Sequence, residues 1–302
     1  MPRAKTPKPR SHPPHAALFD SYSLLFRAFH ALPPLTTKAG EPTSALYGLC
    51  SVVIRVLREE RPARLAFALD AKTRTFRAER YAGYKAGRAR TPSALSRQIE
   101  RLPELLGAFE APLFCVPGFE ADDVLATLCH RLEREEERSV VVSGDRDLLQ
   151  VVSPRTNVLF VGARQQAPVL FDEAAIEARF ELPASKLPSY VALVGDSSDN
   201  LPGVPGIGAR TAAKLVAEHG SIAGLIENLD RIATPKLREA LTRHREQALL
   251  TEELATLRRD VPLAEGPLAA PLTAAARARL ERLFTELEFK SLITRLDALG
   301  FP

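Results

Sequence analysis

Four short apolar runs, alternating with stretches of helical periodicity, constrain the fold of this 302-residue chain more than any other feature. The runs lie at residues 16–19, 64–69, 112–116 and 139–143. The helical stretches are expected over about 20–31, 43–59, 93–110 and 120–138. This alternation is typical of a mainly parallel sheet with helices on both faces. We therefore predict an α/β fold for the first half of the chain.

Acidic side chains gather where these predicted strands end. Asp20, Asp70 and Asp145 each follow an apolar run, and a further acidic cluster opens the helix that starts near residue 120. Because the carboxyl ends of parallel strands meet at one edge of a sheet, we expect these acids to converge. The full set is Asp20, Asp70, Glu120, Asp122, Asp123, Asp145, Asp147, Asp196 and Asp199.

Carboxylates at that density raise one another's pKa values and cost stability unless divalent cations offset them. Mg²⁺ prefers carboxylate and water oxygens, and Mn²⁺ takes similar ligands. Two such ions about 4 Å apart are suited to phosphodiester hydrolysis. Each acid alone is equally explained as a helix cap or a turn residue. Their coincidence at several strand ends favours a site for two Mg²⁺ or Mn²⁺ ions.

The net charge of only +4 conceals a strongly basic segment at residues 72–90. This segment holds seven Lys and Arg residues against one acid, Glu79, with Tyr81 and Tyr84 among them. Basic side chains neutralise phosphates, and aromatic faces stack on unpaired bases. A solvated helix face is the ordinary explanation of such a run. Its position directly after Asp70 instead favours contact with nucleic-acid phosphates.

A glycine-rich turn in the second half precedes a helix expected to start at about Ala209. Glycine lets backbone N–H groups approach a phosphate closely, and the N-terminus of a helix favours the anion. Such a hairpin grips a nucleic-acid backbone without reading sequence, whereas a plain turn between two helices is the alternative. The candidate contacts are Gly203, Gly206, Gly208, Arg210 and Lys214. The remainder, about 221–302, is expected to be helical and to pack on the hairpin.

The first fifteen residues are basic and rich in proline, so we expect a disordered tail that is either a weak polyanion contact or a spare solvated terminus. They lack the apolar centre of a signal peptide. No apolar run approaches the ~20 residues needed to span a bilayer. The sequence therefore predicts a cytoplasmic protein without membrane association.

Five stretches of the chain resemble the bacterial 5′-nuclease family, which comprises the 5′→3′ exonuclease domain of DNA polymerase I and flap endonucleases. They occur in the family's order and span roughly residues 16–300. The stretches are FHALPPLTTKAGEPTSALYG, FALDAKTRTFRAERYAGYKAGR, VPGFEADDVLATL, GDRDLLQ and LVGDSSDNLPGVPGIGARTAAKL. The resemblance implies a PIN-like nuclease domain over 16–184, with a helical arch at about 72–92. It also implies a helix-three-turn-helix DNA-binding domain with further helices over 185–302.

The resemblance also assigns roles to individual residues. It places Asp20, Asp70, Glu120, Asp122 and Asp123 on one side of the metal cluster, and Asp145, Asp147, Asp196 and Asp199 on the other. It makes Lys85 the contact to the scissile phosphate and Arg88 its basic partner. Tyr84 becomes a stacking residue, with Arg77 and Tyr81 as further DNA contacts. Potassium bound by hairpin carbonyls near Gly203–Gly208 is a further family feature.

The chain departs from the family at Ser21, where glycine is usual, and it ends where longer members begin their proofreading and polymerase domains. We therefore expect a free-standing nuclease that depends on a separate polymerase and ligase. We expect a monomer, since no exposed apolar repeat suggests a larger assembly. Its expected substrates are DNA 5′ ends and flaps, with RNA primers in RNA–DNA duplex also possible substrates, in replication and repair. The alternatives are a DNA-binding protein that has lost cleavage, which the nine acids disfavour, and a PIN-type ribonuclease, which the hairpin disfavours.

Overall fold

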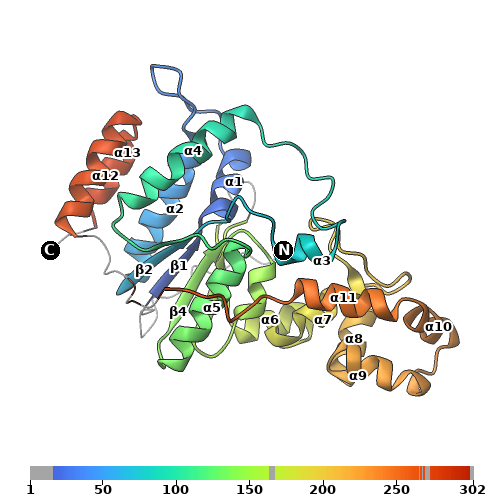
Figure 1. The fold of residues 1–302 in the computed structure, drawn as a ribbon. Coiled ribbons are helices and arrows are strands. Elements are labelled where there is room, and N and C mark those ends of the chain that lie inside the picture. Colours follow the sequence, from blue (N-terminus) through green and yellow to red (C-terminus); the bar gives the residue numbers. More distant parts are fainter. Residues whose placement is uncertain (1–15, 163–166, 265, 267, 269–272, 300–302) are drawn as a thin grey trace.

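The computed structural model describes residues 16–162, 167–264, 266, 268 and 273–299, so the tail expected at 1–15 lies outside the described residues. Within these ranges the chain forms a six-stranded sheet with the order β3-β2-β1-β4-β5-β6 (Figure 1). The strands are β1 (Ala16–Asp20), β2 (Arg64–Ala68), β3 (Leu113–Phe114), β4 (Ser139–Ser143), β5 (Thr156–Phe160) and β6 (Val169–Phe171). The α/β class predicted from the apolar runs is confirmed.

The sheet is parallel except for β6, which pairs antiparallel with β5. Strand β1 lies at the centre, in register with β2 on one side and β4 on the other. The chain passes from β1 outward to β3 and then returns to β4, so the strand order reverses between β1 and β4. In open α/β sheets the crevice beyond the carboxyl ends of the strands at such a reversal is the usual ligand site.

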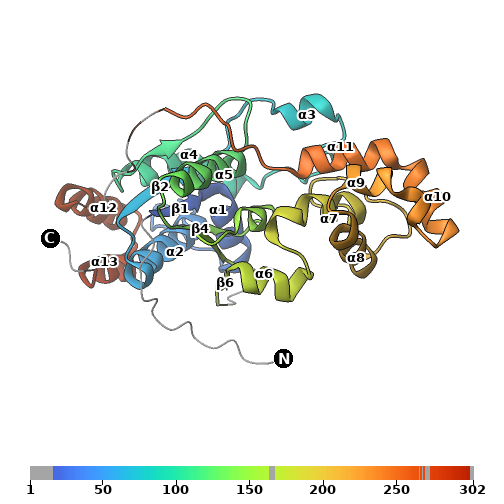
Figure 2. The same ribbon diagram turned by 90° about the horizontal axis from the view of Figure 1, so that it is seen from below.

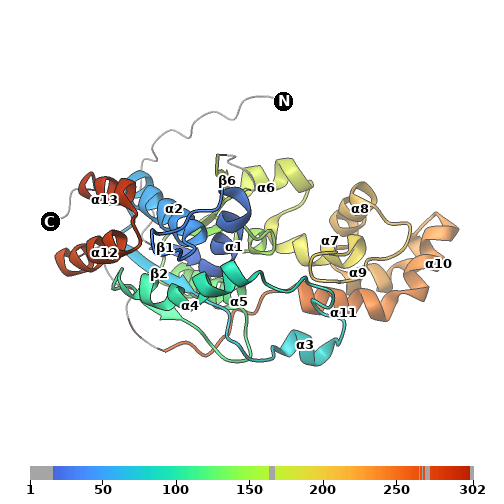
Figure 3. The ribbon, with the colours of Figure 1, turned by 90° about the horizontal axis from the view of Figure 1, so that it is seen from above.

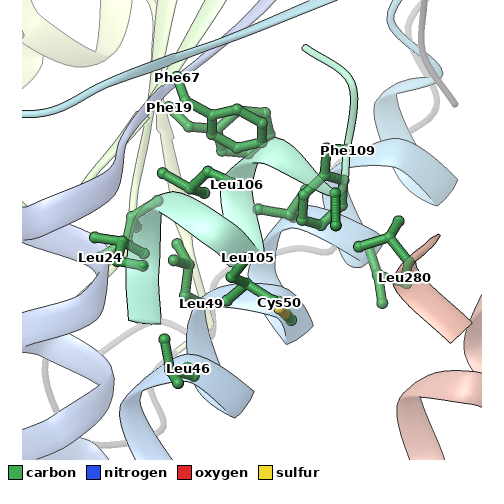
Figure 4. Packing of buried hydrophobic residues seen from close by; sticks show 14 of the residues in the cluster. Phe19, Leu24, Leu46, Leu49, Cys50, Phe67, Leu105, Leu106, Phe109 and Leu280 are labelled. Atoms are coloured by element: carbon green, nitrogen blue, oxygen red, sulfur yellow. The ribbon is translucent and has the colours of Figure 1, made fainter. Parts of the chain in front are cut away.

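Helices cover both faces of the sheet because its strands are apolar on both sides. Alternate residues of β1 point to opposite cores: Phe19 faces one cluster and Leu18 the other. The first face carries α1 (Ser21–Ala31), α2 (Ser44–Glu60) and α4 (Ser93–Gly107); the second carries α5 (Ala121–Arg134), the 3₁₀ turn η1 (Asp147–Val151) and α6 (Glu173–Phe180). Figure 4 shows Phe19, Phe67, Leu106 and Phe109 packed in the first core.

A second, all-helical part extends from one end of the sheet and its covering helices (Figures 2 and 3). Its own apolar cluster includes Leu193, Ile207, Leu215 and Ile222. Its elements are η2 (Ala184–Lys186), α7 (Leu187–Val194), α8 (Ala209–His219), α9 (Ile222–Glu227), η3 (Leu229–Arg231), α10 (Pro235–Arg243) and α11 (Arg245–Ala255).

The final helices, α12 (Ala274–Glu286) and α13 (Lys290–Asp297), do not pack on the hairpin as expected. Leu280, Phe284 and Leu292 are buried in the first core, and the ring of Phe289 lies 5.4 Å from that of Tyr47 in α2. All three ribbon views place these two helices at the end of the molecule opposite α8–α10. An apolar stripe shows that a helix is packed but does not identify the surface that it covers.

The basic segment 72–90 is not a helical arch in this structure. It contains only α3 (Phe76–Arg80), a helix of five residues, followed by turns from Ala82 to Gly87. Gly87 has a left-handed φ of 89°, and Lys85 a φ of 56°, so the backbone cannot continue as a helix there.

Candidate metal and DNA site

The acids that follow the strands converge on one cavity of about 810 Å³ at the carboxyl edge of the sheet. The lining acids come from separate parts of the chain: Asp20, Asp70, Glu120, Asp122, Asp145 and Asp196. Lys85 and Arg88 of the basic segment line the same cavity. The convergence expected from the parallel sheet is therefore present for these residues.

Hydrogen bonds tie the ends of β1 and β4 together beside this cavity. Asp20 accepts from the backbone N–H of Ser23 at 3.2 Å, which caps α1, and from the hydroxyl of Ser143 at 2.6 Å. The Ser143 hydroxyl also accepts from the backbone N–H of Asp145 at 2.8 Å. Asp20 is thus a helix cap and a site residue at once, so the two explanations weighed for it are compatible.

The N-terminus of α5 gathers a second group of acids. Asp70 accepts from the backbone N–H of Ala121 at 2.7 Å, so it satisfies one of the free donors at the start of that helix. Glu120 immediately precedes the helix, and Asp122 lies in its first turn. Negative charge is favourable at a helix N-terminus, which partly offsets the cost of clustering carboxylates there.

Asp147 and Asp199 lie beside the cavity-lining acids. The backbone N–H of Asp147 donates to Asp145 at 3.0 Å, and burial, then the charges of Asp145, Asp199 and Asp196, raises the pKa of Asp147 well above its usual value. Asp199 is buried and accepts hydrogen bonds from Arg88 and from the Tyr84 hydroxyl, both at 2.7 Å.

Burial makes several of these carboxyl groups hard to ionise. It raises the pKa of Asp20 to about 7, and the charges of Asp145 and Asp70 add to this shift. Burial is also the main reason that the pKa values of Asp70 and Asp122 are raised. A nearby divalent cation favours the charged form of a carboxyl group, so cations in the cavity would reverse these shifts.

No three His, Cys, Asp or Glu side chains in the described part of the chain are close enough to form a preformed metal cage. The donor set still fits Mg²⁺, which keeps several waters and is usually held by one or two carboxylates rather than by an all-protein cage. Carboxylates that face one open cavity, with raised pKa values, meet that requirement.

Lys85 adopts a left-handed backbone conformation that is uncommon for a residue other than glycine. Its N–H donates to the carbonyl of Asp199 at 2.9 Å, and its ammonium group donates to Glu120 at 2.8 Å. Burial lowers the pKa of Lys85, but the charges of Glu120 and Asp199 outweigh it, so the pKa is raised and the side chain stays cationic. Strained backbone of this kind clusters at functional sites.

Two predicted site residues are paired with each other instead of facing the cavity. Asp123 is 0% exposed and Arg77 is 1% exposed, and their side chains form two hydrogen bonds of 2.6 and 2.7 Å. The expectation that Asp123 binds metal and Arg77 binds DNA is therefore wrong for this conformation, because neither side chain reaches the cavity or the surface.

Tyr84 also differs from expectation, because its side chain is not free to stack on a base. The residue is 8% exposed, and its hydroxyl lies 2.8 Å from a Glu120 oxygen and 2.7 Å from an Asp199 oxygen, so its single proton is shared between the two carboxylates. Tyr81, by contrast, is only half-buried.

The predicted hairpin connects α7 to α8. A Cβ atom added to Gly203 would lie 2.4 Å from the carbonyl carbon of Val194, so only glycine allows the two chain segments to pass there. Gly206 has a φ of 85°, and Gly208 is the N-cap of α8. Arg210 and Lys214 are exposed on α8, with Lys214 3.9 Å from Glu218.

Two family models match adjoining parts of the chain. Residues 15–181 match the 5′-3′ exonuclease N-terminal resolvase-like domain, and residues 182–278 match the 5′-3′ exonuclease C-terminal SAM fold. The chain belongs to the 5′-3′ exonuclease family. The two matches meet between α6 and η2, close to where the sheet gives way to the helical part.

Relatives of the chain include bacterial DNA polymerases. It is 41% identical over 295 residues to DNA polymerase I of Mycobacterium tuberculosis, covering 97% of this chain and 32% of the relative. It is 40% identical over 285 residues to the thermostable DNA polymerase I of Thermus aquaticus, covering 94% of this chain and 33% of the relative. The chain thus spans about a third of the length of these relatives.

Solved structures with a similar fold include nucleases. The T5 5′-exonuclease with bound zinc superposes with a TM-score of 0.64 at 19% identity, covering 94% of this chain and 99% of that one. The catalytic core of Rad2 in complex with DNA substrate gives a TM-score of 0.63 at 14% identity, covering 95% and 93%. These likenesses support the 5′-3′ exonuclease fold. Among the described residues, no helix has the length and apolar content required to cross a membrane.

The cavity also has lining residues for which the sequence had suggested no role. Tyr22, Phe26, Arg27 and His30 of α1 line it together with the acids. Arg27 donates to the carbonyl of Gly144 at 2.5 Å. The available signal was the spacing of residues 22, 26 and 30, which places three ring-bearing side chains on one helical face directly after Asp20.

Proposed function

We propose that this chain hydrolyses DNA phosphodiesters from the 5′ end and at 5′ flaps, with divalent metal ions, and leaves 5′-phosphate products. One observation carries the proposal: acids from separate elements of a 5′-3′ exonuclease fold line one cavity together with Lys85 and Arg88. A non-cleaving binding protein has no need to maintain so many buried carboxylates at a cost in stability.

Eight acids are proposed to hold two Mg²⁺ or Mn²⁺ ions. Bound ions of this kind supply Lewis-acid activation of water and neutralise charge on the phosphate and the leaving oxygen. Asp20, Asp70, Glu120 and Asp122 would hold them from one side, and Asp145, Asp147, Asp196 and Asp199 from the other. The zinc-bound T5 5′-exonuclease supports divalent metal in this fold.

Lys85 and Arg88 are proposed to stabilise negative charge on the phosphate as the bond breaks. Both cations now pair with site acids, Lys85 with Glu120 at 2.8 Å and Arg88 with Asp199 at 2.7 Å. Metal ions bound in the cavity would neutralise Glu120 and Asp199 in place of the two basic side chains. Lys85 and Arg88 could then contact a phosphate. Charge placed in advance beside a reacting centre is an effective form of catalysis.

Duplex DNA is proposed to lie along the hairpin, with the N-terminus of α8 and the cations Arg210 and Lys214 against its backbone. The Rad2 catalytic core was solved in complex with DNA substrate, which supports DNA binding by this fold. We further propose K⁺ held by backbone carbonyls at Gly203–Gly208. Tyr81 would contact the single strand.

The proposed substrates are DNA 5′ ends and flaps, including RNA primers in RNA–DNA duplex, in the cytoplasm. Removal of such strands leaves gaps or nicks, which polymerase and ligase activities must fill and seal. We propose that the chain acts as a monomer, which light scattering of the purified protein would test.

The decisive experiment incubates the protein with a labelled 5′-flap DNA and with the matching RNA, each with and without Mg²⁺. We expect Mg²⁺-dependent cleavage of the DNA flap to 5′-phosphate products. Replacing Asp145 and Asp147 together with alanine should abolish cleavage and leave DNA binding largely intact. Binding without cleavage by the parent protein would favour the non-cleaving alternative, and preferential cleavage of the RNA would favour a ribonuclease.

A further inference from the structure

The buried pair of Arg77 and Asp123 joins parts of the molecule that are far apart in the sequence. Arg77 lies in α3, within the basic segment, and Asp123 lies in the first turn of α5. The two planar groups face each other through two parallel hydrogen bonds, Nη1 to Oδ2 at 2.6 Å and Nη2 to Oδ1 at 2.7 Å. A bidentate pair of this kind fixes orientation as well as distance.

The same pair also holds the chain as it leaves the helical domain. We call residues 254–258, at the end of α11 and just beyond it, the strap; the orange-red chain that leaves α11 runs from there past α5 in Figure 1. The Arg77 side chain donates to the carbonyl of Leu254 at 2.7 Å and to that of Thr256 at 3.3 Å. Asp123 accepts from the backbone N–H of Arg258 at 2.9 Å.

Both oxygens of the Asp123 carboxylate already accept hydrogen bonds from groups outside the cavity. Its Oδ1 accepts from Arg77 and from the N–H of Arg258, and its Oδ2 accepts from Arg77 and from the N–H of Glu120 at 3.2 Å. Glu120 in turn binds Lys85. A continuous set of hydrogen bonds thus leads from the strap, through Arg77 and Asp123, to Glu120 and the ammonium group of Lys85.

We propose that Arg77 and Asp123 form a positioning pair that locks the basic segment and the strap to the start of α5. The lock sets where Lys85 and Arg88 lie relative to the site acids, and it fixes the DNA-gripping helices relative to the nuclease core. Neither residue contacts metal or DNA. The inference rests on the proposed function only for its effect on cleavage.

The test compares the parent chain with three single variants of the full chain: Asp123→Asn, Arg77→Lys and Leu132→Ala. Arg77→Lys keeps the charge but cannot reproduce the planar fork. Leu132→Ala removes a buried side chain further along α5 and serves as a control for lost stability alone. A misplaced Lys85 should lower the single-turnover cleavage rate on the order of 10²-fold in both pair variants. The Leu132→Ala protein should cut at the parent rate at a temperature where it is folded.

Two further measurements distinguish a positioning role from direct binding of metal or DNA by this pair. The Mn²⁺ affinity of Asp123→Asn, measured by electron paramagnetic resonance, should equal that of the parent, whereas Asp122→Asn should bind more weakly. Amide hydrogen exchange should accelerate in both the strap and residues 76–88 for either pair variant, and in neither segment for Leu132→Ala.

A double variant, Arg77→Met with Asp123→Asn, keeps the proposal testable if a single variant fails to fold, because it leaves no unpaired buried charge. It should lose no more activity than either single change, since the two residues act as a unit. Additive losses, weaker Mn²⁺ binding by Asp123→Asn, or a reduced salt dependence of DNA binding in the double variant, which lacks the Arg77 charge, would each overturn the inference. If the parent protein cuts no flap, the proposed function fails, whereas the coupled exchange of strap and basic segment still tests the lock.

Discussion

Asp20 shows how a single residue can serve the fold and the site at the same time. One of its oxygens caps α1 and the other binds Ser143, yet the residue faces the cavity and burial raises its pKa to about 7. Its neighbour Ser21, by contrast, has a side chain without hydrogen bonds in the described part of the chain. The Ser21 hydroxyl is also buried.

Replacing Ser21 with alanine should stabilise the protein. A buried hydroxyl without a partner costs desolvation free energy, so its removal should raise the free energy of unfolding by about 1 kcal/mol. Urea denaturation of metal-free protein measures this. Ser23→Ala is the matched control, because the Ser23 hydroxyl accepts from the N–H of Gly144 at 3.1 Å and its loss should destabilise. Equal losses in both variants would show that the Ser21 hydroxyl has a favourable role.

Replacing Lys85 with alanine should slow cleavage much more than it weakens DNA binding. The Lys85 side chain is only 26% exposed and its ammonium group lies among carboxylates, where its charge acts on a bound phosphate rather than on distant DNA. We expect a loss on the order of 10²-fold in the single-turnover rate. Lys214→Ala, on the exposed face of α8, should instead lower affinity and leave that rate unchanged. An unchanged rate in the Lys85 variant would remove this residue from the chemistry.

At the scale of elements, the hairpin depends on close approach of two backbone segments. Gly195 and Gly203 lie against each other where the chain leaves α7, and the N–H of Asp196 bonds to the carbonyl of Leu201 at 2.8 Å. The same short segment carries Asp196 into the metal cavity and leads to the hairpin. A change in the backbone of the hairpin should therefore shift Asp196 in the cavity.

Gly203→Ala should disturb the hairpin, because the added methyl group would meet backbone atoms of Val194 and Gly195 at 2.4–2.6 Å. Overpacking of this kind costs about 1–3 kcal/mol of unfolding free energy, and duplex affinity should fall with it. Gly107→Ala, at the end of α4 and outside the hairpin, is the control, since no atom lies within 4 Å of a Cβ added there. Urea denaturation and fluorescence anisotropy with a labelled duplex measure both effects. Equal losses at the two glycines would contradict a role for close backbone packing.

At the scale of the whole molecule, the two domains are joined at the site itself. The strap bonds to Arg77, Asp123 and Gln150, and the basic segment bonds to Asp199 and Asn200 of the loop before the hairpin. Helices α12 and α13 then close the far side of the first core. The packing of both domains therefore holds the site acids together. Their mutual repulsion lowers the free energy of unfolding.

The metal-free protein should therefore lose stability as the pH rises. Because the folded-state pKa of Asp20 is about 7, above its unfolded value near 4, the folded protein binds more protons between these values. The free energy of unfolding should fall from about pH 4 to pH 7, by on the order of 4 kcal/mol at most from this group.

Thermal unfolding across that pH range measures the effect, and Asp20→Asn, which cannot ionise, should have a shallower decline. Mg²⁺ should raise the unfolding temperature more at pH 8 than at pH 5, because its ligands must be deprotonated. A steeper decline in Asp20→Asn than in the parent protein would contradict this assignment.

The sequence by itself determined the fold class, the edge of the sheet where the site lies, and the acids that follow the strands. Short apolar runs and strand-end carboxylates are local signals, and parallel strands necessarily bring their carboxyl ends to one edge. Only the tertiary structure decided the roles of Asp123, Arg77 and Tyr84. Consecutive residues of a helix point about 100° apart, so the orientation of α5 decides that Asp122 faces the cavity and Asp123 the core. The partner of Arg77 lies 46 residues away, beyond the reach of any local pattern.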